Sequence, residues 1–404
     1  MTGLGLPKAD RPKEVGLSAK RLARLSATFR QDVERNMIPG AVVVIARGGC
    51  VGYAEAFGWR DREAEAPMKL DAIFRIASMT KPLTSVAAMI LAEEGKLQIA
   101  APVAEYLPEL ADRTVGAERV PAKRTMTVQD LLRHTSGLTY ATFGDSPVQM
   151  IWRDAQLMTP DQTSAELVSK LASLPLLFEP GTTWEYSMST DVLGRVVEVV
   201  SGQDLADFID ARICRPLGLH DTGFAATGER AGRVAEPQID PAIGKRPPMH
   251  DVIHLGRWAS GGGGAVSTAA DYARFCQMLL NGGELDGSRL LAPKTVALMA
   301  SDHLPPDCAY GDTARSRFGA LAPVPEMGYG FGLGFAVRTA AGRCPLPGSV
   351  GEYFWGGVHG TAFWIDPVEQ LVVVTMMLAP ERRLYYRHLL RPLVYGALVG
   401  PIRD

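Results

Sequence analysis

The sequence predicts an α+β fold in which one antiparallel sheet, flanked by helices, is interrupted by a mainly helical insertion. Strand-like segments gather near both ends of the 404-residue chain, whereas helical patterns and Pro- and Gly-rich loops dominate between about residues 80 and 321. Strands from both ends can share one sheet only if the middle of the chain is inserted between them. We therefore expect a discontinuous α/β domain from residues 1–79 and 322–404, and a mainly helical domain from residues 80–321.

The first elements are a helix and a hairpin. Residues 17–36 carry apolar side chains at helical spacing, and Ser18 is placed as an N-cap. Residues 41–46 and 51–57 then read as two strands, because Gly48 and Gly49 supply a turn between them.

The C-terminal part repeats this character. The segments 330–337, 362–365 and 371–378 are strand-like, and residues 381–399 are helical in pattern. Pro392 is expected to kink or break that helix. Arg383, Arg387 and Arg391 are spaced by four residues, which predicts the solvated face of the helix.

Composition narrows the classes of function. The chain is 47% hydrophobic with a formal net charge of −2, so no global basic field draws it to nucleic acid or to a membrane surface. We expect a small-molecule partner. Met1 to Arg30 has no apolar core typical of a secretory signal, and the five cysteines have no C-x-x-C spacing. These features favour a cytoplasmic protein without a metal or other cofactor, and they leave its oligomeric state open.

Ser78 and Lys81 form the first candidate reactive pair. They are three residues apart, directly after a strand-like run at 72–77 and before an apolar stretch at 82–93. Residues at this spacing share one face of a helix, so the ammonium can reach the hydroxyl. A serine at a first helical turn also lies where backbone N–H groups favour negative charge. The spacing alone is weak evidence, because chance can supply it.

Two later segments add candidate partners. Tyr186 lies on a polar loop after Pro180-Gly181 and before an apolar helix that begins at Asp191. Residues 354–360 are strand-like, and their glycines are typical of places where a ligand or another backbone segment approaches a strand closely. Each segment has a purely structural alternative, a packed tyrosine in one case and a bulged strand in the other.

Taken in order, these three segments resemble the serine hydrolases of the class C β-lactamase and penicillin-binding-protein superfamily, most closely the family VIII carboxylesterases. The motifs that carry the resemblance are Ser78 to Lys81, Tyr186 to Met188 and Trp355 to Gly357; further similar stretches are residues 134–138, 180–182 and 261–267. The resemblance implies a β-lactamase-like fold with the active site between the two domains.

The resemblance also implies a mechanism. Ser78 would form an acyl-enzyme, and Lys81 would activate it either as a neutral amine or, as an ammonium, by stabilising the phenolate of Tyr186. Tyr186 would move the proton between Ser78 and the leaving alcohol. The backbone N–H groups of Ser78 and Val358 would form the oxyanion hole.

Departures from the β-lactamase pattern bear on the substrate. Trp355 replaces a lysine that meets the substrate carboxylate, and Met188 replaces an asparagine, so neutral, apolar acyl groups are favoured. We expect a carboxylesterase for short to medium acyl chains. The alternatives are a β-lactamase of the cephalosporin type, a D-amino-peptide hydrolase, an acyltransferase, or a non-catalytic binding protein.

The remaining substrate contacts are less specific. Gly356 and Gly357 are expected to line the site, and Tyr140, Trp258 and His359 are candidate pocket walls for which an ordinary packing role is the alternative. Irregular segments at about 140–160, 236–258 and 304–327 are expected to shape the entrance.

Overall fold

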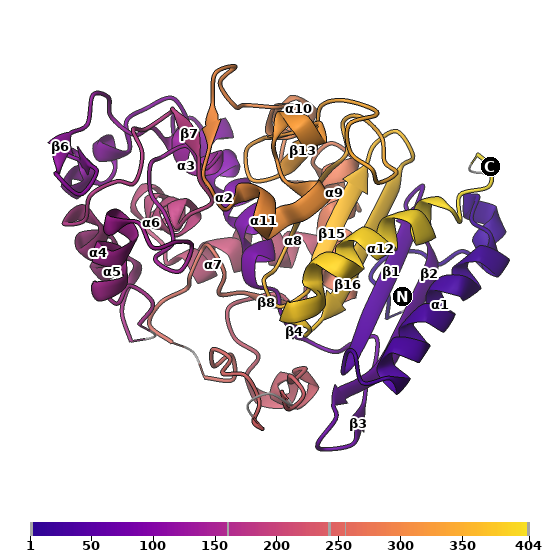
Figure 1. Ribbon diagram of the computed structural model, residues 1–404. Helices are drawn as coiled ribbons and strands as arrows, with labels where there is room; N and C mark the ends of the chain where they lie inside the picture. The colour runs from indigo at the N-terminus through magenta and orange to yellow at the C-terminus, as the bar shows by residue number, and fades with distance from the viewer. Residues whose placement is uncertain (1–2, 160, 241–243, 255, 402–404) are drawn as a thin grey trace.

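The computed structural model describes residues 3–159, 161–240, 244–254 and 256–401. Its centre is one antiparallel sheet of eight strands that draws on both ends of the chain (Figure 1). In spatial order the strands are β12 (Tyr329–Phe331), β13 (Ala336–Arg338), β14 (Tyr353–Gly356), β15 (Ala362–Asp366), β16 (Leu371–Met377), β1 (Gly40–Arg47), β2 (Cys50–Asp61) and β3 (Ala66–Pro67).

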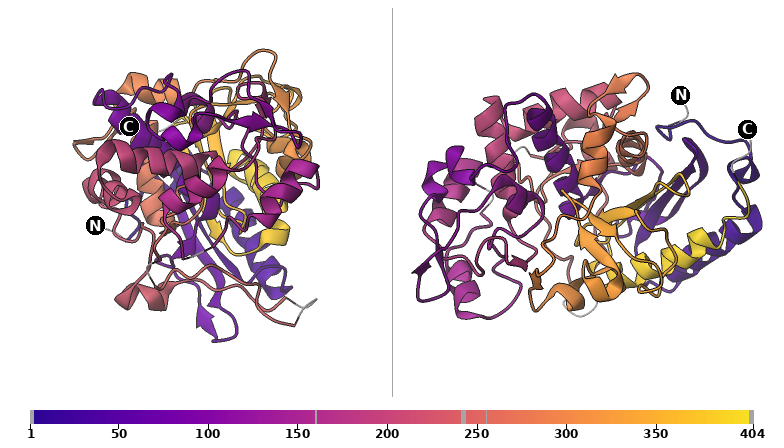
Figure 2. Two further views of the ribbon diagram at one scale, coloured as in Figure 1. Left: turned by 90° about the vertical axis from the view of Figure 1, so that its left-hand side faces the viewer. Right: turned by 90° about the horizontal axis from the view of Figure 1, so that it is seen from above.

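The N-terminal hairpin joins the C-terminal meander at the pair β1 and β16. Their register runs from Ala41 opposite Met377 to Arg47 opposite Leu371. Every residue of β1 is buried, because α1 (Ala19–Glu34) and α12 (Arg383–Tyr395) cover one face of the sheet and α9 (Ala269–Leu280) covers the other (Figure 2). A strand covered on both faces becomes continuously apolar, as the sequence of β1 is.

Several predicted elements are confirmed. Ser18 caps α1 by accepting a hydrogen bond from the Arg21 amide, and Gly48 and Gly49 turn the hairpin with φ values of 58° and 79°. The antiparallel sheet flanked by helices is the predicted fold class. The division into domains at residues 79/80 and 321/322 stays a prediction.

Helices, many of which lie on the left of Figure 1, are the main regular elements of the segment between the two halves of the sheet. They are α2 (Thr80–Glu93), α3 (Val128–Leu132), α4 (Pro147–Asp154), α5 (Ser164–Ala172), α6 (Ser189–Ser201), α7 (Leu205–Ile209), α8 (Arg215–Leu217), α10 (Pro293–Met299) and α11 (Ala314–Phe318). Short paired strands connect them: β4 (Phe74–Arg75) with β8 (Val266–Ser267), β5 (Thr114–Val115) with β6 (Val120–Pro121), β7 (Thr183–Trp184) with β11 (Ala309–Tyr310), and β9 (Glu284–Leu285) with β10 (Ser288–Arg289).

Two strand predictions are corrected. The expected strand at 330–337 is a hairpin of β12 and β13, because Gly334 turns the chain at φ 107° and the Gly332 amide donates to the Phe335 carbonyl. The run at 72–77 contributes only the two residues of β4, which pair with β8 outside the main sheet.

Two helical predictions are also corrected. Pro392 does not end α12, which continues to Tyr395 because Leu390 and Val394 are buried on either side of the proline. The expected entrance loops contain helices, namely α4 within 140–160 and α11 within 304–327. Residues 160, 241–243 and 255 of these segments lie outside the described part of the chain.

Candidate active site

Ser78 lies on a tight turn that is held from both sides. The spacing predicted Ser78 in the first turn of an α-helix, but it lies on the 3-10 turn Ala77–Met79, two residues before α2 begins at Thr80. Ala77 has a φ of 46°, a conformation that costs a residue with a Cβ about 1 kcal/mol or more. Tyr272 donates to the Met79 carbonyl at 2.8 Å and Thr361 donates to the Ile76 carbonyl at 3.1 Å. These contacts leave Ser78 half-exposed between buried neighbours.

Lys81 is buried, and its ammonium has named partners. Its Nζ donates to the Gly262 carbonyl at 2.7 Å and to the Tyr140 hydroxyl at 3.1 Å, and it lies 4.7 Å from the centroid of the Tyr186 ring. Burial alone lowers the pKa of Lys81, but Tyr140, Tyr186 and Asp191 together raise it above the ordinary value. The lysine is therefore held as an ammonium at neutral pH.

Asp191 is a site residue that the sequence did not single out. It lies at the third position of α6, is buried, and accepts hydrogen bonds from Ser260 Oγ at 2.5 Å and from the Gly262 amide at 3.0 Å. The Gly262 peptide group thus joins Asp191 to Lys81. A Cβ at Gly262 would come within 2.3 Å of the Asp191 carboxylate, so only glycine fits there.

Burial raises the pKa of Asp191, and the Lys81 charge opposes that shift. The one available signal in the sequence was an acidic residue at the start of an otherwise apolar helix, five residues after Tyr186.

Tyr186 lies on the loop between β7 and α6, and its phenol is 8% exposed. The Trp355 indole Nε1 donates to the Tyr186 hydroxyl at 3.2 Å. The His134 ring packs 4.8 Å from the Tyr186 ring, and the pKa of His134 is held far below its usual value by burial and then by the Lys81 charge. His134 is therefore a neutral packing partner, and its carbonyl accepts the Glu185 amide at 2.9 Å to hold the loop.

The predicted oxyanion donors lie on two facing segments. The amide of Gly357 donates to the Thr361 carbonyl at 2.8 Å and Arg387 donates to the Gly357 carbonyl at 2.5 Å, which fixes the turn that presents Val358. A Cβ at Gly357 would lie 2.5 Å from the Ile76 carbonyl, so glycine is required where β14 approaches the Ser78 turn. Among the described residues, no backbone hydrogen bond outside the regular helices and strands uses the N–H of Ser78 or Val358.

Ser78 lines a cavity of about 340 Å³. Of the predicted site residues, Tyr140, Tyr186, Gly356, Val358 and His359 line it together with Ser78. Met188 lines a neighbouring cavity of about 440 Å³, which shares Tyr140, Thr142 and Met158 with the first. The described lining of the Ser78 cavity does not include Trp258, Gly357 or Trp355.

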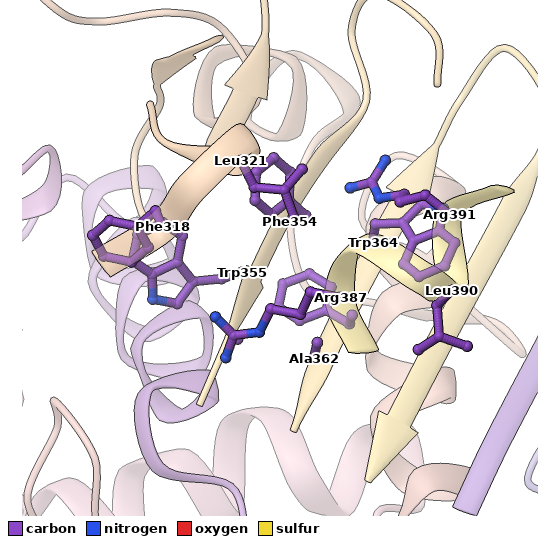
Figure 3. A pocket seen from close by; sticks show the side chains of 11 residues that line it. Phe318, Leu321, Phe354, Trp355, Ala362, Trp364, Arg387, Leu390 and Arg391 are labelled. Atoms are coloured by element: carbon purple, nitrogen blue, oxygen red, sulfur yellow. The ribbon is translucent and has the colours of Figure 1, made fainter. Parts of the chain in front are cut away.

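Trp355 therefore contacts Tyr186 in the structure and does not form part of the cavity wall. It is 3% exposed and packs against Phe318, as Figure 3 shows beside the Arg387 side chain. Its indole N–H is aimed at the phenol oxygen, which a sequence comparison of side-chain polarity could not reveal.

No group of three or more His, Cys, Asp or Glu side chains among the described residues is placed to hold a metal ion, and no described helix has the length and apolar character needed to cross a membrane.

Comparison with known proteins identifies the family of the chain. Residues 25–385 match the β-lactamase family. The chain is 35% identical to the protein Rv1367c of Mycobacterium tuberculosis over 367 residues, covering 87% of this chain and 88% of the relative. It is 34% identical to Esterase EstB of Burkholderia gladioli over 386 residues, covering 90% and 92%.

A solved structure is also similar. EstCE1, described as a hydrolase with promiscuous acyltransferase activity, superposes with a TM-score of 0.80 at 29% identity, over 95% of this chain and 99% of that one. These matches confirm the resemblance seen in the motifs, and the protein accordingly belongs to the β-lactamase family of serine hydrolases.

Proposed function

We propose that the protein is a serine carboxylesterase in which Ser78 is the nucleophile and Tyr186, supported by Lys81, is the general base. The observation that carries the proposal is the convergence of Lys81 Nζ and the Trp355 indole N–H on the Tyr186 ring and hydroxyl at the wall of the Ser78 cavity. A nearby positive charge and a donated hydrogen bond both stabilise a phenolate, which is the proton-accepting form.

The reaction follows from these placements. Ser78 Oγ bonds to the ester carbonyl carbon while its proton passes to Tyr186, and the carbonyl oxygen receives the N–H groups of Ser78 and Val358. The bond to the alcohol oxygen then breaks, and Tyr186 returns the proton to that oxygen. Water repeats the two steps on the acyl-enzyme and releases the acid.

Lys81 could act as a neutral amine that takes the Ser78 proton or as an ammonium that stabilises the Tyr186 phenolate. Its ammonium form favours the second role. Because the pKa of Lys81 is raised, it does not readily accept the Ser78 proton. It acts as a fixed positive charge beside two tyrosines, of which Tyr140 receives its hydrogen bond and Tyr186 lies under its cation.

The proposal is tested with short-chain p-nitrophenyl esters and four variants. Ser78→Ala should abolish turnover, and Tyr186→Phe should lower kcat by about a hundredfold or more because the proton carrier is removed. Tyr140→Phe should cost less, since it removes only one partner of Lys81. Tyr385→Phe is the matched control, because this tyrosine is 47% exposed on α12.

Two outcomes would overturn the assignment. Ester turnover that survives in Ser78→Ala would exclude this mechanism. Near-normal turnover in Tyr186→Phe together with a large loss in Tyr140→Phe would move the base role to Tyr140.

A second candidate activity is acyl transfer to an alcohol, which is favoured by the similarity to EstCE1. The same acyl-enzyme would react with an alcohol in place of water. Adding an alcohol acceptor to the ester assay and measuring the new ester against released acid decides between the two. A chromogenic cephalosporin in the same panel tests the β-lactamase alternative, and turnover of the cephalosporin alone would contradict the ester assignment.

We also propose a cytoplasmic location, supported by five cysteines that are all unpaired. Cell fractionation with an antibody to the native chain is the direct test.

A further inference from the structure

Three arginines line the Ser78 cavity, although the sequence spacing placed two of them on a solvated helix face. Arg383 and Arg387 reach the cavity from α12, and Arg317 reaches it from α11. The Arg387 guanidinium extends toward the end of β14 beside Trp355 (Figure 3). All three side chains are partly buried.

None of the three has a carboxylate partner among the described residues. Every ion pair of the described chain involves other basic side chains, whereas these three donate only to backbone carbonyls: Arg317 to Thr142, Arg383 to Pro380, and Arg387 to Gly357 and Thr361. The Nε atoms of Arg317 and Arg387 are buried and have no hydrogen-bond partner. A buried donor without a partner costs free energy unless a ligand satisfies it.

The guanidinium group of Arg383 is also close enough to repel those of Arg317 and Arg387. Burial and then the charge of Arg383 lower the pKa of Arg387 to about 10. The same two causes lower the pKa of Arg317, and the charge of Glu185 opposes that shift. Positive charges are thus gathered on one wall at a cost that the charge of Glu185 offsets only in part at Arg317.

The other charges of the cavity cancel. At its base the carboxylate of Asp191 faces the ammonium of Lys81, with the Gly262 peptide group between them. Burial lowers the pKa of His359 to about 4 and also lowers that of His250, so both imidazoles on the wall are neutral near pH 7. The arginine wall, defined as Arg317, Arg383 and Arg387, is therefore an unbalanced positive surface facing the space where a substrate lies.

We propose that the arginine wall binds a carboxylate carried by the ester substrate, so that the preferred substrates are half-esters or other esters with an anionic group. This rests on the proposed esterase function and narrows its substrate class. Guanidinium groups bind carboxylates through paired N–H donors, and several of them in a partly dry cavity strengthen that contact. The aromatic side chains of Tyr140, Phe143 and Phe318 enclose the apolar remainder of the substrate.

The test compares each anionic ester with a neutral amide of the same shape. Monomethyl adipate against methyl adipamate places the carboxylate on the acyl side, and 4-acetoxybenzoate against 4-acetoxybenzamide places it on the alcohol side. We expect kcat/KM at pH 8 to favour the anionic member of at least one pair by roughly tenfold or more. The pair that shows the preference identifies the side of the ester that faces the arginine wall.

Variants assign the preference to the arginine wall. Arg383→Gln and Arg317→Gln should each lower the anionic-to-neutral ratio severalfold while turnover of the neutral ester is retained, which also shows that the variant is folded. Arg383→Lys should keep most of the ratio because it keeps the charge. Arg382→Gln is the matched control, because Arg382 is next to Arg383 in the chain but its side chain is exposed and does not line the cavity. Added salt should reduce the preference of the wild type.

The outcomes separate this inference from the proposed function. Equal turnover of anionic and neutral esters, or a ratio that Arg383→Gln and Arg317→Gln leave unchanged, would overturn the arginine wall as a carboxylate site while leaving the esterase intact. Turnover of neither class, or turnover that survives in Ser78→Ala, would overturn the esterase itself.

Discussion

At the scale of single residues, the hydrogen bond from Trp355 to the Tyr186 hydroxyl predicts an effect of Trp355 on turnover. A donor at the phenol oxygen stabilises the phenolate and fixes the ring. Trp355→Phe keeps the aromatic ring but removes the donor at 3.2 Å, so kcat for a neutral ester should fall about tenfold with little change in KM.

Trp364→Phe provides the matched control, because its indole is equally buried yet its Nε1 has no hydrogen-bond partner in the structure. Equal kcat values for the two variants would show that the Trp355 indole contributes packing alone.

The raised pKa of Glu185, next to Tyr186, predicts that the free energy of unfolding depends on pH. Burial raises the pKa of this carboxyl to about 7, although the hydrogen bond from Thr139 and the charge of Arg317 oppose the shift. A carboxyl whose pKa is raised in the folded state favours folding below its unfolded value of about 4.5, and that contribution is lost as the pH rises through about 7.

Glu185→Gln should therefore increase the free energy of unfolding at pH 8 by about 1–3 kcal/mol and give no gain at pH 4. Urea denaturation at both values measures the difference. The exposed Glu229→Gln should change stability little at either pH. A gain for Glu185→Gln that is the same at both values would contradict the raised pKa.

At the scale of elements, helix α12 carries two different kinds of arginine. Arg391 is fully buried and pairs with the fully buried Glu352 at 2.5 Å, in a group that includes the hydroxyls of Tyr329 and Tyr395. The expected solvated face is therefore wrong: the stripe faces the sheet at Arg391 and the cavity at Arg383 and Arg387. A spacing of four defines a face of a helix but not what that face contacts.

Removing Arg391 should be costly, because Glu352 would then keep a single ion pair, the longer one with Arg338 at 3.5 Å, beside the hydroxyls of Tyr329 and Tyr395. Arg391→Met should lower the free energy of unfolding by about 3–5 kcal/mol, whereas Arg382→Met on the exposed side should change it by less than about 0.5 kcal/mol. Thermal or urea unfolding compares the two. Similar stabilities would mean that the buried ion pair contributes nothing net.

At the scale of the whole molecule, the sheet ties together the two ends of the chain. Arg47 at the end of β1 donates to the carbonyls of Val15 and Gly400, and the Val399 amide donates to the Gly16 carbonyl. The segments that flank the sheet are thus side by side, although more than 350 residues separate Arg47 from Gly400.

This closeness predicts that a circular permutant should fold. Pro401 would be joined to Gly3 through a flexible linker of about ten residues. New ends would be opened at the exposed turn Asp286–Gly287 between β9 and β10. The permutant should keep ester turnover within a few-fold of the wild type. Inactivity with loss of the cooperative unfolding transition would show that the chain order is needed for folding.

The sequence was most informative where the relevant contacts are short-range. Periodicity located α1, the β1–β2 hairpin and β16. The ordered motifs singled out Ser78 and Tyr186, which line one cavity, and Lys81, whose Nζ lies beside the Tyr186 ring. It was less informative for strand 330–337 and the run at 72–77, because whether an apolar segment pairs in a sheet depends on a partner elsewhere in the chain. The predicted preference for neutral, apolar acyl groups rests on Trp355 and Met188, neither of which lines the Ser78 cavity, and it considers none of the charges that α11 and α12 bring to that cavity.

The sequence by itself determined the family, the fold class and the chemical types of the reactive groups, since these follow from residue identity and local spacing. Only the tertiary structure decided that Asp191 and Gly262 hold Lys81, that the Trp355 N–H points at Tyr186, and that three arginines line the Ser78 cavity. The physical reason is distance along the chain: the Lys81–Gly262 and Tyr186–Trp355 contacts span 181 and 169 residues, and side-chain directions at that range are set by packing.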